Sequence, residues 1–189
     1  MPTFGWSMEM TGEERRLLLQ IARDALTQTL KGGSPQIAVP THPALLLPQG
    51  VFVTLTKGKR LRGCMGRIDP QKALFQTVAE VARSAALEDP RFPSVTVTEL
   101  PDLSIEISVL SPLQKTEAST VEVGRHGLMV KRGFAAGLLL PQVASEQGWS
   151  LEEFLAQTCL KAGLAKEAWR DKTTEIYSFT AEVFSEEDV

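Results

Sequence analysis

The sequence VFVTLTKGKRLRGCMGRI at residues 51–68 decides how this chain folds. Its first six residues are β-branched, aromatic or aliphatic, a composition typical of a β-strand. Lys57-Gly58-Lys59 follows as a turn, so we expect the chain to return over residues 60–68 as the second strand of a β-hairpin. Cys64 then lies midway along the returning strand, away from the hairpin tip.

The returning strand contains the strongest candidate site of the sequence, Leu61-Arg62-Gly63-Cys64-Met65-Gly66. A cysteine reacts as its thiolate, which nearby positive charges stabilise. Gly63 and Gly66 allow a backbone to approach a ligand closely and permit positive φ angles. The alternative is structural, because glycines and lysines also keep sheet edges from pairing and a free cysteine is often buried in a core.

Composition limits the class of protein. The chain has 189 residues, of which 43% are hydrophobic and 23% charged, as expected of one globular domain or two small packed subdomains. No apolar run approaches the roughly 18–20 residues that cross a membrane, and residues 1–10 do not resemble a signal peptide. We therefore expect a cytoplasmic protein without a membrane segment.

Cysteine and histidine usage excludes further classes. The two cysteines, Cys64 and Cys159, have no paired spacing, which fits a reducing compartment and argues against a disulfide framework. With only two histidines, His42 and His126, and no zinc-binding motif, we expect no metal and no cofactor. Cys159 lies among apolar residues of a predicted helix, and we interpret it as a core residue.

Local patterns predict the remaining elements. Capping boxes at Thr11–Glu14 and Ser150–Glu153 predict helices that begin there. Asp69-Pro70 has the pattern of an N-cap and first-turn proline for a third helix. We further expect a proline-rich connector at residues 35–50, a strand with a polar face at 103–110 and a polar connector at 114–124. A second hairpin at residues 127–140 and a final strand at 174–184 would follow. Residues 1–10 would form an N-terminal arm and residues 186–189 a mobile acidic tail.

The order hairpin, proline, helix, strand occurs twice, with Pro70 and Pro141 separated by 71 positions. We therefore predict an α+β fold. Residues 11–185 would form a single domain of two intimately packed subdomains, mainly antiparallel sheet with helices, arranged as two ββαβ-like halves. The loops between the halves would form a cleft.

One functional hypothesis is an enzyme or enzyme subunit. Cys64 would be the nucleophile or thiol carrier, and Arg62 would stabilise its thiolate and bind an anionic group. His126 would act as the base if the two hairpins meet, with Glu106, on the polar face of its strand, orienting the imidazole. For His126 the alternative is a turn residue bonded to backbone, and for Glu106 a solvated surface residue.

The other hypothesis is a binding module. Lys57, Lys59, Arg60, Arg62 and Arg67 place five positive charges within eleven positions, without one acid. Strand alternation would put Arg60, Arg62 and Cys64 on one side, facing a small anionic ligand, RNA or an acidic partner. Nucleic acid is the less favoured ligand, because the net charge is −3 and no aromatic series accompanies the basic residues. The alternative is a solvated basic hairpin.

Arg91 is a third candidate for binding anions. It lies within Asp89-Pro90-Arg91-Phe92-Pro93, where two prolines fix the path of the chain. A guanidinium held on such a loop suits a carboxylate or phosphate, although a surface salt bridge is the commoner arrangement.

These motifs together resemble the AMME-syndrome candidate-region domain family, also called AmmeMemoRadiSam system protein A. The resemblance covers about residues 12–185 and is carried by residues 51–55, 61–66, 89–93, 103–110, 126–128, 137–144 and 161–164. Met65 stands where the family typically has isoleucine. The resemblance implies an α+β fold of two unequal subdomains, a bacterial or archaeal cytoplasmic protein, and association with a Memo-like protein and a radical SAM protein. It implies no particular reaction, although the central hexapeptide is treated as the functional site of the family.

Overall fold

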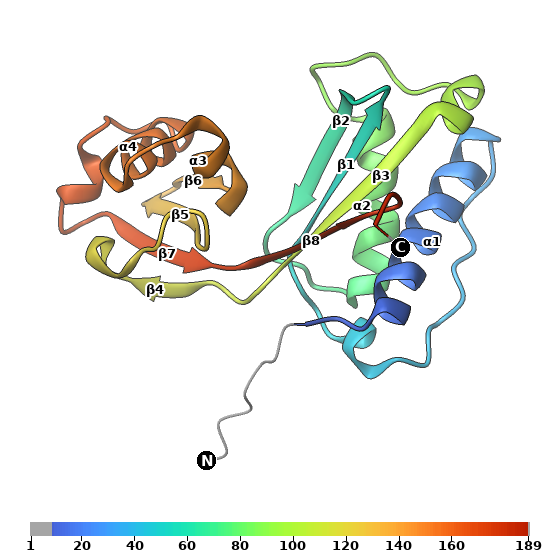
Figure 1. Ribbon diagram of the computed structural model, residues 1–189, viewed down its shortest axis with the longest axis horizontal. Coiled ribbons are helices and arrows are strands. Elements are labelled where there is room, and N and C mark those ends of the chain that lie inside the picture. The colour runs from blue at the N-terminus through green and yellow to red at the C-terminus, as the bar shows by residue number, and fades with distance from the viewer. Residues whose placement is uncertain (1–8, 189) are drawn as a thin grey trace. The chain divides into compact units, whose positions relative to one another are not determined.

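The computed structural model describes residues 9–188 and divides the chain into two compact units. Among the described residues, the first unit contains residues 9–110 and 182–188, and the second contains residues 111–181. Each unit has its own four-stranded sheet with helices packed on it (Figure 1). The expected mixed α+β class is therefore confirmed.

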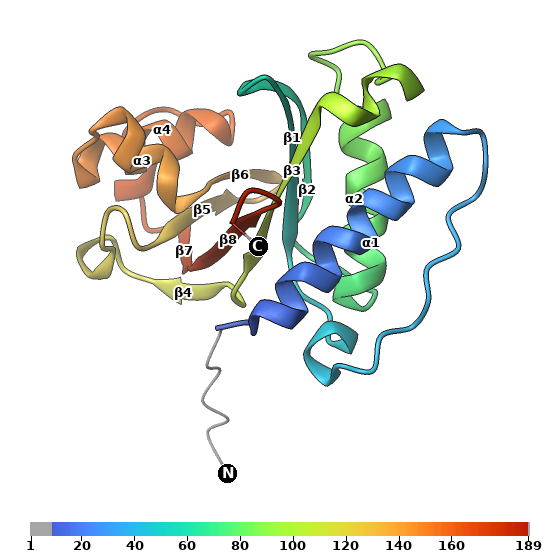
Figure 2. The ribbon, with the colours of Figure 1, turned by 45° about the vertical axis from the view of Figure 1, so that its right-hand side comes forward.

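The first unit is a sheet with the strand order β2-β1-β3-β8. Helices α1 and α2 both lie against one face of this sheet (Figure 2). The elements of this unit are α1 (Gly12–Leu30), β1 (Val51–Lys57), β2 (Arg60–Arg67), α2 (Leu74–Leu87), β3 (Leu103–Leu110) and β8 (Ala181–Ser185), with short 3-10 helices at Pro43–Leu46 and Val97–Asp102.

The second unit is a smaller sheet with the strand order β4-β7-β5-β6. Its elements are β4 (Gln114–Thr116), β5 (Gly127–Arg132), β6 (Ala135–Leu139), α3 (Pro141–Gln147), α4 (Leu151–Lys161) and β7 (Glu175–Phe179), with short 3-10 helices at Ala118–Thr120 and Ala168–Arg170. Helix α4 packs on β5 and β6.

The predicted repetition of a ββαβ pattern is confirmed. In the first unit β1 pairs antiparallel with both β2 and β3, and α2 connects the hairpin to β3. In the second unit β5 pairs antiparallel with both β6 and β7, and two helices connect the hairpin to β7. The first strand of each hairpin is thus an inner strand of its sheet. It lies between the second strand of its hairpin and the strand that follows the helix or helices.

Strand alternation decides which face of the first sheet is buried. Val51, Val53 and Leu55 on β1 are fully buried with the apolar faces of α1 and α2, as are Ile105 and Ile107 on β3. The residues between them point to the opposite face because successive side chains of a strand alternate. This second face carries the polar residues of β1, β2 and β3.

Of the three predicted helix starts, two are confirmed and one is wrong. Thr11 and Ser150 form the predicted capping boxes at the starts of α1 and α4. The prediction that Asp69-Pro70 begins a helix is wrong, since α2 begins at Leu74 without a side-chain cap. Instead the N–H of Leu74 donates to the carbonyl of Leu47, 2.9 Å away, so the preceding connector satisfies this helix end.

The predicted final strand at residues 174–184 is two strands, β7 and β8, which belong to different sheets. The break lies at Thr180, whose N–H donates to the Ser111 hydroxyl at 2.9 Å and whose carbonyl accepts from the Ser111 N–H at 2.9 Å. The acidic tail is attached rather than free over its described part. Glu186 accepts hydrogen bonds from Arg23 and from the N–H of Ile105.

Two short elements, β4 and α3, were not predicted from the sequence. The polar connector at residues 114–124 contains β4, which is three residues long and pairs with β7. Helix α3 also was not expected, and it spans seven residues that end at Gly148 in the left-handed conformation. The predicted N-terminal arm, residues 1–10, lies mostly outside the described residues. Among the described residues, no helix combines the length and apolar character that spanning a membrane requires.

Candidate functional site

A β-bulge in the first hairpin sets the direction of Cys64. Lys57 pairs with Arg60 and Thr56 with Leu61, but the register shifts between Leu55 and Thr56, so Arg62 is the extra residue. Without this shift Cys64 would lie opposite Val53, on the face buried under the helices. With it Cys64 lies opposite Thr54, on the polar face, because a one-residue shift exchanges the two faces of a strand.

Cys64 belongs to a row of polar side chains across three strands. Thr54 on β1 is opposite Cys64 on β2 and also opposite Glu106 on β3. The Thr54 hydroxyl donates a hydrogen bond of 3.3 Å to the Cys64 sulfur. Cys64 is half-buried, so its sulfur is held in place by a donor without being sealed in the core.

The loop after α2 holds the outer edge of β2 at Cys64. The backbone N–H of Cys64 donates 2.8 Å to the carboxylate of Asp89, a side chain that is only 3% exposed. Arg91 binds the same carboxylate through Nε at 3.0 Å and Nη2 at 2.7 Å, and its Nη2 also reaches the carbonyl of Cys64 at 3.5 Å. Asp89 and Arg91 therefore occupy the backbone groups that an edge strand would otherwise expose.

The electrostatics of this pair follow from these contacts. The hydrogen bonds from Arg91 hold the pKa of the Asp89 carboxyl well below its usual range, against the opposing effect of burial. The pKa of the Arg91 guanidinium is raised mainly by its hydrogen bond to Asp89, and the nearby Cys64 side chain adds to the effect. Asp89 and Arg91 thus form a closed ion pair beside the backbone of Cys64.

Arg62, expected to stabilise the thiolate and bind an anion, is bound within the protein. Its Nε and Nη2 donate to the two carboxylate oxygens of Glu99 at 3.0 and 3.1 Å, and its Nη1 donates to the carbonyl of Pro93 at 2.9 Å. The hydrogen bonds from Arg62 and from the N–H of Thr96 lower the pKa of the Glu99 carboxyl to about 2. In this arrangement Arg62 joins β2 to the loop that precedes β3, and its guanidinium is already paired.

The prediction that Arg60, Arg62 and Cys64 share one side is wrong. It assumed an unbroken strand, whereas the bulge at Arg62 interrupts the alternation. By register Arg60 faces the same way as Lys57, and Cys64 faces the opposite way. Among the described residues, Lys59 and Arg60 at the hairpin tip and Arg67 at the far end of β2 have neither a hydrogen bond nor an ion pair through their side chains.

Gly63 and Gly66 are explained by packing. A Cβ on Gly63 would lie 2.1 Å from the carbonyl oxygen of Ala85 on α2, and a Cβ on Gly66 would lie 2.2 Å from the ring of Phe52. Neither glycine has a positive φ. Both let neighbouring groups of the protein approach the strand, so close approach of a ligand remains a prediction.

The other candidate residues lie elsewhere. His126 belongs to the second unit, where its Nδ1 accepts a hydrogen bond of 3.0 Å from the backbone N–H of Glu122. Cys159 is fully buried on α4, and burial raises the pKa of its thiol. Among residues 9–188 no cluster of three His, Cys, Asp or Glu side chains has the geometry to hold a metal ion.

A family model for AMMECR1 matches residues 19–184. The chain belongs to the AMMECR1 family. A protein of Methanothermobacter thermautotrophicus is 45% identical over 187 residues, which cover 94% of this chain and 97% of that protein. The protein MK0488 of Methanopyrus kandleri is 43% identical over 190 residues, covering 95% of this chain and 92% of that protein.

The AMMECR1 fold has also been seen in a crystal. The crystal structure of the uncharacterized protein PH0010 from Pyrococcus horikoshii matches this chain with a TM-score of 0.88 and 41% identity. The match covers 95% of this chain and 94% of that structure. The resemblance drawn from sequence motifs is therefore confirmed at the level of both family and fold.

The two ββαβ halves of this AMMECR1 chain differ at the position of Cys64. In the first half the row across the sheet is Cys64, Thr54 and Glu106. In the second half the row at the same place is Leu138, Met129 and Tyr177. Gly63 precedes Cys64 just as Gly137 precedes Leu138, and each glycine lies against a helix. The scaffold is common to both halves, but only the first half has a thiol and a carboxylate there.

Three residues around Cys64 and the arginines of the candidate site were not predicted from the sequence. Asp89 and Glu99 hold the arginines that had been interpreted as ligand-binding groups, and Thr54 is the donor to the sulfur. Asp89 is the first residue of the motif Asp89-Pro90-Arg91-Phe92-Pro93, so its place beside Arg91 could be read from the sequence. Thr54 could not be paired with Cys64 from the turn alone, because the bulge that sets the register leaves no clear signal in the sequence.

Proposed function

We propose that this AMMECR1 chain acts through the thiol of Cys64, as an enzyme or enzyme subunit of a modification system. The observation that carries the proposal is the hydrogen bond from Thr54 to the Cys64 sulfur, made on the polar face of the sheet beside the ion pair of Asp89 and Arg91. The corresponding row of the second half is Leu138, Met129 and Tyr177, which has no thiol or carboxylate. The sulfur would attack an electrophilic group of the substrate.

The backbone around Cys64 favours a thiol carrier over an acyl-transfer enzyme of the papain type. Such enzymes use backbone N–H groups near the nucleophile to stabilise an oxyanion. Here the N–H of Cys64 already donates to Asp89. A displacement at a saturated carbon of the substrate needs no oxyanion hole and suits this arrangement better. In it the carbon–sulfur bond would form as the bond to the leaving group breaks, and the leaving group would depart with the bonding electron pair.

Glu106 is the proposed proton acceptor within the first unit. It occupies the same row as Thr54 and Cys64, so a carboxylate lies two strands away from the thiol that would give up its proton. The Nδ1 of His126 accepts a backbone hydrogen bond, so in the neutral ring Nε2 carries the proton and is a donor. We therefore assign the role of base to Glu106.

The setting of this chemistry is also a proposal. We place the protein in the cytoplasm, where reducing conditions keep the two cysteines as free thiols. By family resemblance we propose that it works with Memo-like and radical SAM proteins, one of which would complete the site.

Alkylation with iodoacetamide tests the function directly. Native protein should take up one label at Cys64, whereas the buried Cys159 stays unlabelled. Cys64→Ser should abolish labelling and Cys159→Ser should leave it unchanged, with both variants folded by circular dichroism. Labelling of Cys64 no faster than that of Cys159 would contradict the proposal.

A second candidate function rests on Lys59 and Arg60 at the hairpin tip. Both side chains are exposed and have no ion pair among the described residues, and Leu61 beside them is 42% exposed. A non-catalytic module docking an anionic ligand, RNA or a partner protein would use these groups. In that case Lys59→Ala with Arg60→Ala should weaken a salt-sensitive interaction, and Cys64→Ser should not.

A further inference from the structure

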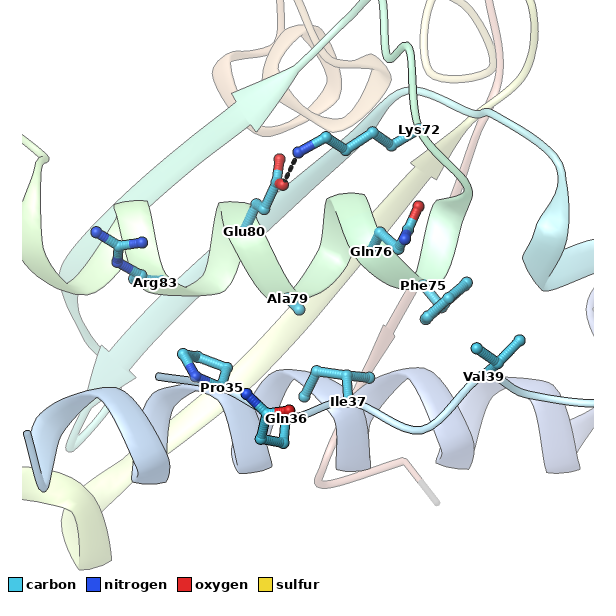
Figure 3. Close-up of a pocket in the computed structure, with 10 residues that line it drawn as sticks. All are labelled: Pro35, Gln36, Ile37, Val39, Lys72, Phe75, Gln76, Ala79, Glu80 and Arg83. Carbon is cyan, nitrogen blue, oxygen red and sulfur yellow. Dashed lines mark hydrogen bonds and ion pairs between the residues drawn. The ribbon is translucent and has the colours of Figure 1, made fainter. Parts of the chain in front are cut away.

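A groove of about 590 Å³ lies between α2 and the extended segment at residues 35–39 (Figure 3). It shares no residue with the row of Cys64, Thr54 and Glu106. Its volume is in the range of typical ligand pockets, although one side is open. The chain of the first unit forms both walls, so the groove is complete within that unit.

The two ends of the groove differ in chemistry. At one end Val39 lies near Phe75, and Ile37 faces Ala79 across the middle of the groove (Figure 3). Val39 is 71% exposed, which is unusual for a large apolar side chain. Arg83 lies at the other end (Figure 3). A ligand with apolar groups near Val39 and an anionic group near Arg83 would match these two ends.

The wall formed by residues 35–39 also has unused backbone groups. Gln36 donates its N–H to the side chain of Gln28 at 2.7 Å. Ile37, Ala38 and Val39 follow without a backbone hydrogen bond to any described residue. A short extended stretch with free N–H and C=O groups is what an added β-strand pairs with.

The charge around the groove is positive. Lys72 pairs with Glu80 on its rim, which leaves Arg83 with no partner among the described residues. Arg67, equally unpaired, lines an adjoining cavity of about 110 Å³ that shares Lys72 and Glu80 with the groove. Two uncompensated guanidinium groups favour an acidic ligand.

We propose that this groove binds an extended, acidic segment of another protein by strand addition. The bound segment pairs its backbone with residues 37–39 and places apolar side chains between Ile37, Phe75 and Ala79. A carboxylate of the segment binds Arg83. The groove thus gives the protein a peptide-binding surface that is separate from Cys64 and independent of its chemistry.

Selection of a phage-displayed library of random linear twelve-residue peptides on the purified protein tests the proposal. Enriched peptides should carry an acidic residue next to alternating apolar residues, and synthetic copies should bind in fluorescence anisotropy. Arg83→Glu should weaken their binding by about tenfold or more, because it replaces attraction by repulsion. Lys166→Glu, the same charge change on an exposed residue of the second unit, should not.

Strand addition has its own matched pair of variants. Val39→Pro removes a backbone N–H and should weaken the peptides about tenfold, whereas Val39→Ala keeps the N–H and should have a much smaller effect. Cys64→Ser should leave binding unchanged. The proposal is overturned if no peptide is enriched, or if binding survives both Arg83→Glu and Val39→Pro. It is also overturned if the protein alone forms a dimer that Arg83→Glu dissociates, since the occupant is then a second copy.

Discussion

The backbone N–H of Cys64 donates a hydrogen bond of 2.8 Å to the buried carboxylate of Asp89. This bond connects the strand that carries the thiol to the loop that carries Arg91. Arg91 closes the arrangement by binding the same carboxylate with two nitrogens. Cys64 is therefore positioned by three groups from two parts of the chain, Asp89 and Arg91 of the loop after α2 at its backbone and Thr54 of β1 at its side chain.

Asp89→Asn should destabilise the first unit by about 2–3 kcal/mol, because charged hydrogen bonds to Arg91 and Cys64 are lost from a buried site. Urea unfolding at pH 7 measures the change. Asp102→Asn is the control, since its carboxylate is 64% exposed and pairs only with Lys57 at 3.8 Å. Equal stability of the two variants would show that the Asp89 bonds do not hold the loop.

Glu99 gives the stability of the protein a defined pH dependence. Its pKa is lowered from 4.5 to about 2 by Arg62 and by the N–H of Thr96. A depressed carboxyl pKa contributes stability that is fully present above pH 4.5 and is lost as pH falls toward 2. Glu99→Gln should therefore cost about 2 kcal/mol at pH 7 and little near pH 2.

Urea unfolding of wild type and Glu99→Gln across this pH range checks the sign. Glu167→Gln, an exposed residue without an ion pair among the described residues, serves as the control and should follow the wild type throughout. A difference between wild type and Glu99→Gln that persists unchanged at pH 2 would mean that the Arg62 pair is not its origin.

Gly63→Ala and Gly137→Ala should each destabilise the unit that contains them, by about 2 kcal/mol or more. Each new Cβ would meet helix backbone, at 2.1 Å from Ala85 and 2.3 Å from Ala162 respectively, and backbone cannot move aside cheaply. Gly12→Ala is the control, because its Cβ meets only a flexible arginine end at 3.4 Å. Thermal unfolding that left either strand variant as stable as Gly12→Ala would contradict this explanation of the repeated glycine.

Much of the fold could be predicted from local patterns. The hairpins, the alternating strand β3 and both capping boxes depend on interactions between residues close in sequence, and all of them are present. Helix α2 starts later than predicted because the distant carbonyl of Leu47 satisfies its first N–H. The last strand divides because Thr180 bonds to Ser111, a contact between residues 69 positions apart. Long-range contacts of this kind leave no local pattern.

Cys64 lies on a hairpin strand as predicted, but the groups around it were not predicted. A basic sequence suggested free arginines, whereas Arg62 is bound by Glu99, which is distant in sequence, and Arg91 is bound by Asp89 of its own loop. The face on which Cys64 lies depends on one bulged residue. Sequence periodicity could not supply either fact.

The most direct test of the account is the rate at which iodoacetamide alkylates Cys64 at pH 7 in wild type, Thr54→Ser and Thr54→Val. The hydroxyl donor is retained in the serine variant and lost in the valine variant, which has nearly the same shape as threonine. We expect Thr54→Ser to react about as fast as wild type and Thr54→Val about tenfold more slowly, since one hydrogen bond to a charged group is lost. Equal rates in all three proteins would contradict the claim that Thr54 prepares the sulfur for reaction.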